Sequence, residues 1–162
     1  MIKVYNNPLL LDFVKMCIAM PQDEREQLEA FFGEPYDVDA AAVGNFTVPG
    51  PKWVGKIDDE PILLGGFVPQ RRGVWRDFLL TTPAAWEKEN WFQATRICRR
   101  VMDAMFISGE AHRLECIVPA ARIASRPVLE RWYKILGYNY EGRLHGYCAN
   151  GADALIYSRV QH

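Results

Sequence analysis

The sequence predicts one domain of mixed α/β type, covering residues 1–162. The chain contains two kinds of segment that follow one another. In one kind apolar and polar residues alternate, as in strands, and in the other apolar residues recur at helical spacing. In the middle of the chain, successive strand candidates are joined by connections short enough for antiparallel hairpins. The expected order is a strand, two helices, a run of strands, a helix, a strand, a helix and two strands.

The first third of the chain predicts one strand and two helices. Residues 1–5 alternate between apolar and polar types, as a strand does. A helix then opens at Asn7 and Pro8, since asparagine is a common cap and proline a common first helical residue. A second, more charged helix covers residues 23–32 and ends at a glycine. Residues 41–48 are a further strand candidate, next to a loop rich in proline and glycine.

The middle of the chain predicts a meander of strands followed by a helix. The strand candidates are residues 52–58, 61–70 and 74–82, and the short connections between them contain aspartates or glycine. The helix that follows covers residues 91–106, with apolar side chains inward and arginines largely outward.

The last third predicts a strand, a helix and two strands. Residues 114–118 alternate in the manner of a strand with one face against a core. Apolar residues then recur at helical spacing between Ser125, which suits an N-cap, and Gly137, the expected C-terminal stop. Strands follow at residues 138–147 and 154–160.

The composition is that of an ordinary globular protein and argues against several classes. Hydrophobic residues make up 49% of the chain and charged residues 24%. The net charge of -1 argues against nucleic-acid binding through bulk electrostatics, and such a module would need the arginines of residues 71–76 and 96–100 on one face. The cysteines and histidines show no metal-binding spacing, so no metal site is predicted. No segment reaches the roughly 18 apolar residues of a membrane span and no signal peptide is recognised, so a cytoplasmic location is expected.

The segment from Trp132 to Gly142, WYKILGYNYEG, resembles the C-terminal half of the GNAT superfamily of N-acetyltransferases. In that family a helix carrying a tyrosine is followed by a glycine and an aromatic residue, and then by a strand carrying Glu-Gly. At the level of element order the resemblance covers nearly the whole chain, and residue by residue it begins near Arg113. The matching residues are Tyr133, Gly137, Tyr138, Glu141 and Gly142.

This resemblance implies a GNAT-like fold, with a central mixed and mostly antiparallel sheet of about six or seven strands and about four flanking helices. It also implies acetyl-CoA as the cofactor, held where two neighbouring parallel strands part, here residues 74–82 and the strand that begins near Arg113. The pyrophosphate would rest on the start of the helix after the first of these strands, because helix N-termini favour phosphate. The residues expected to bind the cofactor are Leu80, Thr82, Asn90, Trp91 and Phe92.

Two residues are candidates for catalysis on the same ground. Tyr133 stands where many family members keep a tyrosine that protonates the leaving thiolate, and Asp77 is a candidate to accept the proton of the amine. Each residue has a structural alternative. Tyr133 could be an aromatic residue of a core helix, and Asp77 could be a surface acid on the outward face of its strand.

The phosphate-binding segment departs from the family pattern, which reads R/Q-x-x-G-x-G/A. No glycine occurs between Thr81 and Ser108. Glu87 and Glu89 stand near the place where the pyrophosphate would dock and would repel it. Arg126 also replaces the asparagine that the family usually keeps before its tyrosine.

Two hypotheses follow. The first is an N-acyltransferase that transfers an acetyl group from acetyl-CoA to an unidentified amine. The alternative is a catalytically inactive protein that resembles the GNAT-like internal virion proteins of short-tailed bacteriophages and contacts a phage or host protein, in the host cytoplasm or the virion interior. Trp86 and Trp91, beside the altered segment, would anchor such a partner or would fold inward as a small core.

Overall fold

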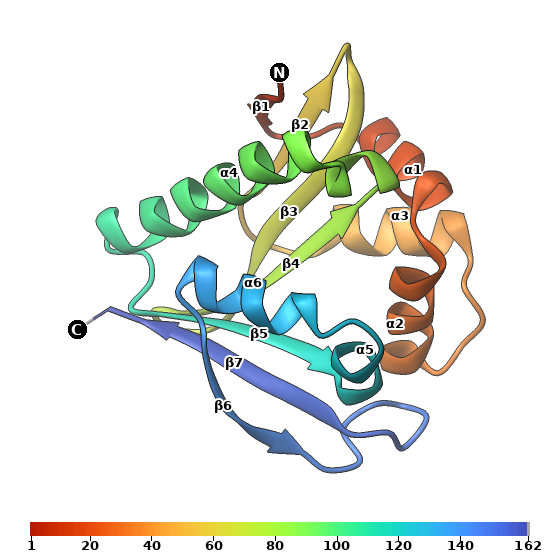
Figure 1. Ribbon diagram of the computed structural model, residues 1–162, viewed down its shortest axis with the longest axis vertical. Helices are drawn as coiled ribbons and strands as arrows, with labels where there is room; N and C mark the ends of the chain where they lie inside the picture. Colours follow the sequence, from red (N-terminus) through yellow and green to blue (C-terminus); the bar gives the residue numbers. More distant parts are fainter. Residues whose placement is uncertain (162) are drawn as a thin grey trace.

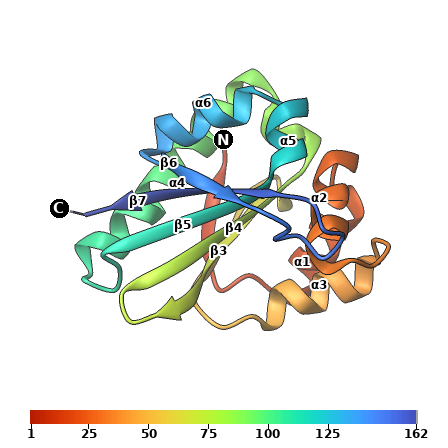
Figure 2. The ribbon, with the colours of Figure 1, turned by 90° about the horizontal axis from the view of Figure 1, so that it is seen from below.

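The computed structural model describes residues 1–161 and shows a seven-stranded sheet with helices on both faces (Figure 1, Figure 2). The strand order is β1-β2-β3-β4-β5-β7-β6, and only the pair β4–β5 is parallel. This arrangement confirms the expected mixed, mostly antiparallel sheet. The strands are β1 (Lys3–Asn6), β2 (Lys52–Ile57), β3 (Glu60–Arg71), β4 (Val74–Thr81), β5 (Arg113–Pro119), β6 (Asn139–Leu144) and β7 (Ala154–Val160). The helices are α1 (Leu10–Ala19), α2 (Gln22–Phe32), α3 (Val38–Thr47), the 3-10 turn η1 (Pro83–Trp86), α4 (Lys88–Ile107), α5 (Ala120–Ser125) and α6 (Val128–Leu136).

Each face of the sheet has its own core. On one face α1 and α3 pack together, and Phe13 and Met16 of α1 meet Val54 and Leu64 of the sheet. On the other face α4 and α6 cover a larger cluster that includes Trp132. Figure 2 shows these two layers of helices on opposite sides of the sheet. Side chains that alternate along a central strand therefore contribute to different cores.

Strands β4 and β5 lie side by side for only part of their length. Their register joins Val74 to Arg113 and ends at the pair of Arg76 with Glu115. Beyond this pair β4 continues to Thr81 with no strand among the described residues paired to that edge, whereas β5 stays paired with β7 along its whole length. The sheet therefore opens into a wedge between β4 and β5, as the resemblance to the GNAT superfamily implies.

The strand expected at residues 41–48 is wrong, because this segment lies in helix α3. The Asp37 side chain caps the helix, accepting a hydrogen bond from the Ala40 amide at 2.7 Å. The start of α1 also differs from the prediction. Helix α1 begins at Leu10, whereas Asn7 makes a turn with a left-handed φ of 64°.

The predicted N-cap at Ser125 is wrong, because Ser125 ends the additional helix α5. Pro127 disfavours helical geometry at the preceding residue, and Arg126 accordingly adopts φ -137° and ψ 71°. The chain therefore contains two short helices here, and the described residues form six α-helices where about four were expected. The stop at Gly137 is confirmed, since this residue ends α6 with a left-handed φ of 92°.

Candidate active site where two strands part

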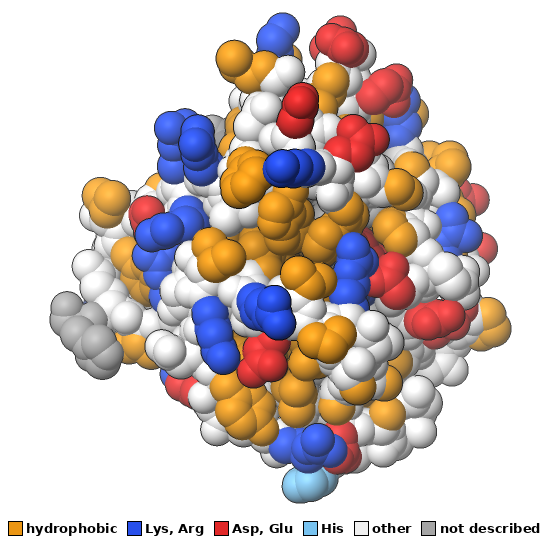
Figure 3. Space-filling model, in the orientation of Figure 1, with side chains coloured by type: hydrophobic (Ala, Val, Ile, Leu, Met, Phe, Trp, Pro, Cys, Tyr) orange, Lys and Arg blue, Asp and Glu red, His pale blue; other side chains and the backbone are white. Residues whose placement is uncertain are grey.

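A cavity of about 490 Å³ occupies the wedge and reaches both faces of the sheet. Hydrophobic side chains also gather on the face of the molecule that α4 and α6 cover (Figure 3). The alternation of β4 divides the cavity into two sides. Asp77 and Leu79 face α4 and α6, whereas Arg76 and Phe78 face α2 and the loop before β7. Further lining residues on α2, α4, β5 and α6 include Glu24, Gln27, Phe31, Met102, Cys116 and Tyr133.

Asp77 faces the cavity directly after the last β4–β5 pair. The hydroxyl of Tyr138 donates a hydrogen bond to its Oδ2 atom at 2.5 Å. Burial raises the pKa of Asp77 to about 6, while the bond from Tyr138 opposes that rise by stabilising the carboxylate. The alternative of a surface acid therefore does not hold, although the catalytic role of Asp77 stays a prediction.

Tyr133 is buried at the cavity wall, between the rings of Tyr138 and Tyr157. Its hydroxyl lies near the thiol of Cys116, and Asp77 lies near the same thiol on the cavity wall. Burial raises the pKa of Tyr133 well above its usual value, so the phenol stays protonated at neutral pH. The structure thus brings both predicted catalytic residues to one cluster.

Cys116 and Tyr138 complete this cluster, and neither was predicted from the sequence as a site residue. Cys116 belongs to the face of β5 that meets α6, and Tyr138 follows the glycine that ends α6. The alternation of residues 114–118 could have shown that Cys116 faces inward. No local pattern could have shown the contact between Tyr138 and Asp77, because 61 residues separate them.

The open edge of β4 also presents backbone groups to the wedge. The amide of Thr82 bonds the carbonyl of Ile62 in β3 at 3.0 Å, whereas the amide of Thr81 points away from β3 and reaches the Glu24 side chain at 3.0 Å. Backbone groups alternate in direction along a strand, so the amide of Leu79 also points into the wedge. Leu79 lines the cavity, and its amide is available to a bound molecule.

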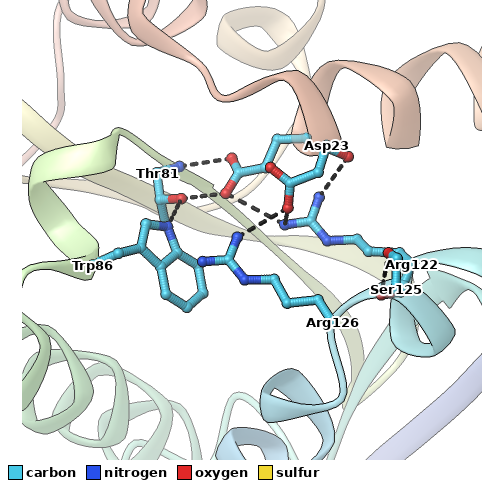
Figure 4. A network of polar contacts seen from close by, with 7 residues as sticks. Asp23, Thr81, Trp86, Arg122, Ser125 and Arg126 are labelled. Carbon is cyan, nitrogen blue, oxygen red and sulfur yellow. Dashed lines mark hydrogen bonds and ion pairs between the residues drawn. The ribbon is translucent and has the colours of Figure 1, made fainter.

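A polar network closes the open end of the wedge (Figure 4). The buried carboxylate of Glu24 accepts hydrogen bonds from both the amide and the hydroxyl of Thr81. The indole nitrogen of Trp86 in turn donates to the Thr81 hydroxyl oxygen at 2.8 Å. Burial raises the pKa of Glu24, and the bonds from Thr81 and the charge of Arg122 oppose that rise. Helix α2 is thereby tied to the end of β4.

Two arginines join this network from the other side of the wedge. Arg122 of α5 lies 3.4 Å from the Glu24 carboxylate and 3.6 Å from Asp23. Arg126 pairs with Asp23 at 2.9 Å and stacks over the Trp86 ring, 3.7 Å from its centroid. The network therefore bridges α2, η1 and the segment after β5 (Figure 4).

The five residues expected to bind the cofactor do not meet at the cavity. Leu80 is buried and lines it, whereas Thr82 is tied to β3. The Asn90 side chain donates to a backbone carbonyl of η1, and Phe92 is 60% exposed. Helix α4 begins at Lys88, three residues before the predicted start at Trp91.

The tryptophans beside the altered segment fold inward. Trp86 and Trp91 stack with a centroid separation of 4.4 Å, and Trp91 lies 4.8 Å from the ring of Trp132 on α6. They form a small aromatic core between η1, α4 and α6, which was one of the two predicted alternatives.

The helices of residues 1–161 include none with the length and apolar character that a membrane span requires.

Comparison with solved structures identifies the fold as that of GNAT acetyltransferases. A GNAT-family acetyltransferase from Streptococcus pneumoniae is similar with a TM-score of 0.67 and 11% identity, over 99% of this chain and 100% of that chain. A spermidine N-acetyltransferase from Vibrio cholerae gives 0.68 and 16%, over 98% and 94%. AAC(6')-Ib, solved in complex with ribostamycin and coenzyme A, gives 0.69 and 12%, over 99% and 93%.

These identities are low, so the likeness concerns the fold. No protein-family model matches the sequence, and no curated protein matches it. The comparisons give no support to the more specific resemblance to bacteriophage virion proteins. The cofactor and the substrate of this chain must therefore be inferred from its own residues.

Proposed function

We propose that this chain is an N-acyltransferase that transfers an acetyl group from acetyl-CoA to an amine in the cavity between β4 and β5. The observation that carries the proposal is the position of Asp77, which faces the cavity at the point where the two strands part. Its pKa of about 6 leaves it ionised, yet basic, at neutral pH. An amine must lose a proton when it attacks a thioester, and Asp77 is suited to accept that proton.

The reaction moves one proton from the amine to the departing sulfur. The amine nitrogen attacks the thioester carbon, and Asp77 takes its proton. The amide of Leu79 donates to the carbonyl oxygen while negative charge develops there. The carbon–sulfur bond then breaks, and Tyr133 gives its phenolic proton to the sulfur. The proton on Asp77 returns to Tyr133 through the thiol of Cys116, which lies near both groups.

The residues at the wedge fit the thioester end of acetyl-CoA better than its phosphate end. The apolar side chains of α4 and the free amide of Leu79 suit the pantetheine arm and its acyl group. At the open end, Glu24 holds the amide of Thr81, and Glu87 precedes α4 without a compensating phosphate loop. On this proposal, binding of acetyl-CoA requires Glu24 to release Thr81.

A second candidate function is a binding protein that keeps the fold but not the reaction. The occupied amide of Thr81 favours it, because a carboxylate of the chain itself takes a donor that the cofactor would otherwise use. The partner in that case would be another protein, including the virion or host proteins that the sequence analysis considered. Acetyl-CoA would then bind weakly or not at all.

Calorimetry with acetyl-CoA and an assay of thiol release with a panel of amines test the two functions. The first function predicts binding at micromolar acetyl-CoA and release that depends on the amine. Asp77→Asn should lower kcat/KM by about 100-fold, since it removes the proton acceptor. Asp39→Asn, at an exposed position on α3, serves as the matched control and should leave kcat/KM unchanged.

Two results would contradict the first function. Absence of acetyl-CoA binding at millimolar concentration would leave the binding protein as the remaining candidate. Normal turnover in folded Asp77→Asn would remove Asp77 from the reaction and, with it, the observation on which the proposal depends.

A further inference from the structure

Arg76 lies in the cavity wall on the face of β4 opposite to Asp77. Among residues 1–161, its guanidinium group makes one hydrogen bond, from Nη1 to the hydroxyl of Tyr147 at 3.3 Å. Its nearest carboxylate oxygen, on Glu115, is 3.8 Å away, and its Nε atom is buried without a hydrogen-bond partner in the described structure. Arg76 therefore uses few of the five donors that an arginine carries.

The neighbouring carboxylates do not take up this spare capacity. Glu115 lies closer to Arg113, whose Nε atom donates to it at 2.8 Å. Arg113 also forms a two-pronged pair with Glu141, which lowers the pKa of Glu141 to about 2. The charge of Glu115 is thus engaged mainly by another arginine. Arg76 retains the capacity for an additional carboxylate.

The wall around Arg76 is largely apolar and aromatic. Phe31 of α2 meets the ring of Tyr147 edge to face, with centroids 6.4 Å apart. Leu28 and Phe78 lie on the same side of the cavity. An arginine fork among apolar walls recognises a planar carboxylate through two parallel hydrogen bonds, and the walls accommodate an apolar side chain.

The acids near Arg76 do not suit a polycationic amine. Glu24, which lines the cavity, is already bound to Thr81 and to Arg122, and Glu115, which pairs with Arg76 across the strands, is bound to Arg113. On the side of the cavity that α2 borders, the charged group with unused hydrogen-bonding capacity is the cation Arg76. The ligand of this side should accordingly be an anion.

We infer that the acceptor is an amino acid with an apolar or aromatic side chain, and that Arg76 binds its carboxylate. Arg76 and Asp77 are consecutive on β4 and both line the cavity, one on each face, so a molecule that extends through the wedge reaches both of them. Its carboxylate lies at Arg76 and its amine is directed toward Asp77. The direction of the amine rests on the proposed acyl transfer, whereas binding of the carboxylate does not.

Calorimetry with N-acetyl-L-phenylalanine and with its carboxamide tests this inference without any need for turnover. The parent protein should bind the acid at least about tenfold more tightly than the amide. Arg76→Met should abolish that preference, and Arg76→Lys should lose most of it, because lysine keeps the charge but lacks the fork. Arg72→Met, at an exposed arginine of the β3–β4 turn, should retain the full preference.

Equal affinity for acid and amide, or binding of neither compound to the parent protein, would overturn the inference. A preference for the acid that persists in folded Arg76→Met would do the same, and Arg76→Lys gives the answer if the methionine variant does not fold. The proposed acyl transfer is tested separately, by acetylation of phenylalanine from acetyl-CoA. If the preference for the carboxylate depends on Arg76 but phenylalanine is not acetylated, the binding site is supported and the acyl transfer is contradicted.

Discussion

At the scale of single residues, the site depends on how one partly buried carboxyl group is kept ionised. Asp77 loses hydration in the cavity wall, which raises its pKa to about 6. Tyr138 offsets part of that cost, because its hydrogen bond to Oδ2 is stronger when Asp77 is a carboxylate than when it is protonated. The two residues therefore act as a pair, although their positions in the sequence are far apart.

Tyr138→Phe should raise the pKa of Asp77 further, because the carboxylate loses a donor while its burial is unchanged. Since Asp77 must be ionised to accept a proton, kcat/KM should fall below about pH 6 in the parent protein and begin to fall at higher pH in the variant. The measurement is the pH profile of kcat/KM. Tyr140→Phe changes an exposed ring on β6 and should leave the profile where it is. Coincident profiles for all three proteins would contradict the role of Tyr138.

At the scale of elements, helix α2 is fixed to the end of β4 by one side chain. Glu24 is buried between Thr81 and Arg122, which supply its hydrogen bonds and its counter-charge. The sequence predicts α2 as a solvated, charged helix, and its periodicity does not reveal that one of its acids points inward. Glu24 and Thr81 are 57 residues apart, so only the packing of α2 against the end of the sheet brings them together.

Glu24→Ala should destabilise the fold by about 3 kcal/mol, because it leaves the buried Arg122 charge and both donors of Thr81 without their acceptor. Glu24→Gln should cost less, since its amide oxygen still accepts from Thr81. Urea unfolding gives these free energies. Glu26→Ala, at an exposed position on the same helix, should change stability by less than about 0.5 kcal/mol. A loss of the same size at both positions would show that the effect comes from the helix and not from the network.

At the scale of the whole molecule, the order of elements was largely predictable, because most strands and helices are long enough to show their own period. The helix α3 was not, since the run of small and apolar residues at 41–48 carries no period that separates helix from strand. The break between α5 and α6 could have been predicted from Pro127, whose effect on Arg126 is local.

The wedge itself was predicted through the resemblance to a known fold, whereas most of its contents were not. Strand alternation places Asp77 and Leu79 on the same face of β4. It does not show which helices cover that face until the elements that pack against β4 are known. The cavity brings together segments from Glu24 to Tyr147, and contacts over such separations leave no mark on local patterns. The position of the site could therefore be predicted from the sequence, whereas the presence of Arg76 and Glu24 in it could not.

The separation of β4 from β5 should be detectable in the hydrogen-exchange rates of two neighbouring amides on β4. The amide of Leu79 points into the wedge, whereas the amide of Leu80 points toward β3, where Leu64 is its partner in the register. Leu79 should exchange at least about tenfold faster than Leu80, and acetyl-CoA should slow only the exchange of Leu79. Equal protection of the two amides in the free protein would mean that the edge of β4 is paired after all.

Helix α2 touches both ends of the cavity, and this has a consequence for how two ligands would share the protein. Its Glu24 holds the amide of Thr81, while its Phe31 forms part of the wall near Arg76. On the proposed function, acetyl-CoA must displace Glu24 from the Thr81 amide, and the wall near Arg76 should then shift with the helix. The affinities of the two ligands are then linked: each ligand changes the affinity of the other by the same factor. Binding in one half of the cavity therefore strengthens or weakens binding in the other half.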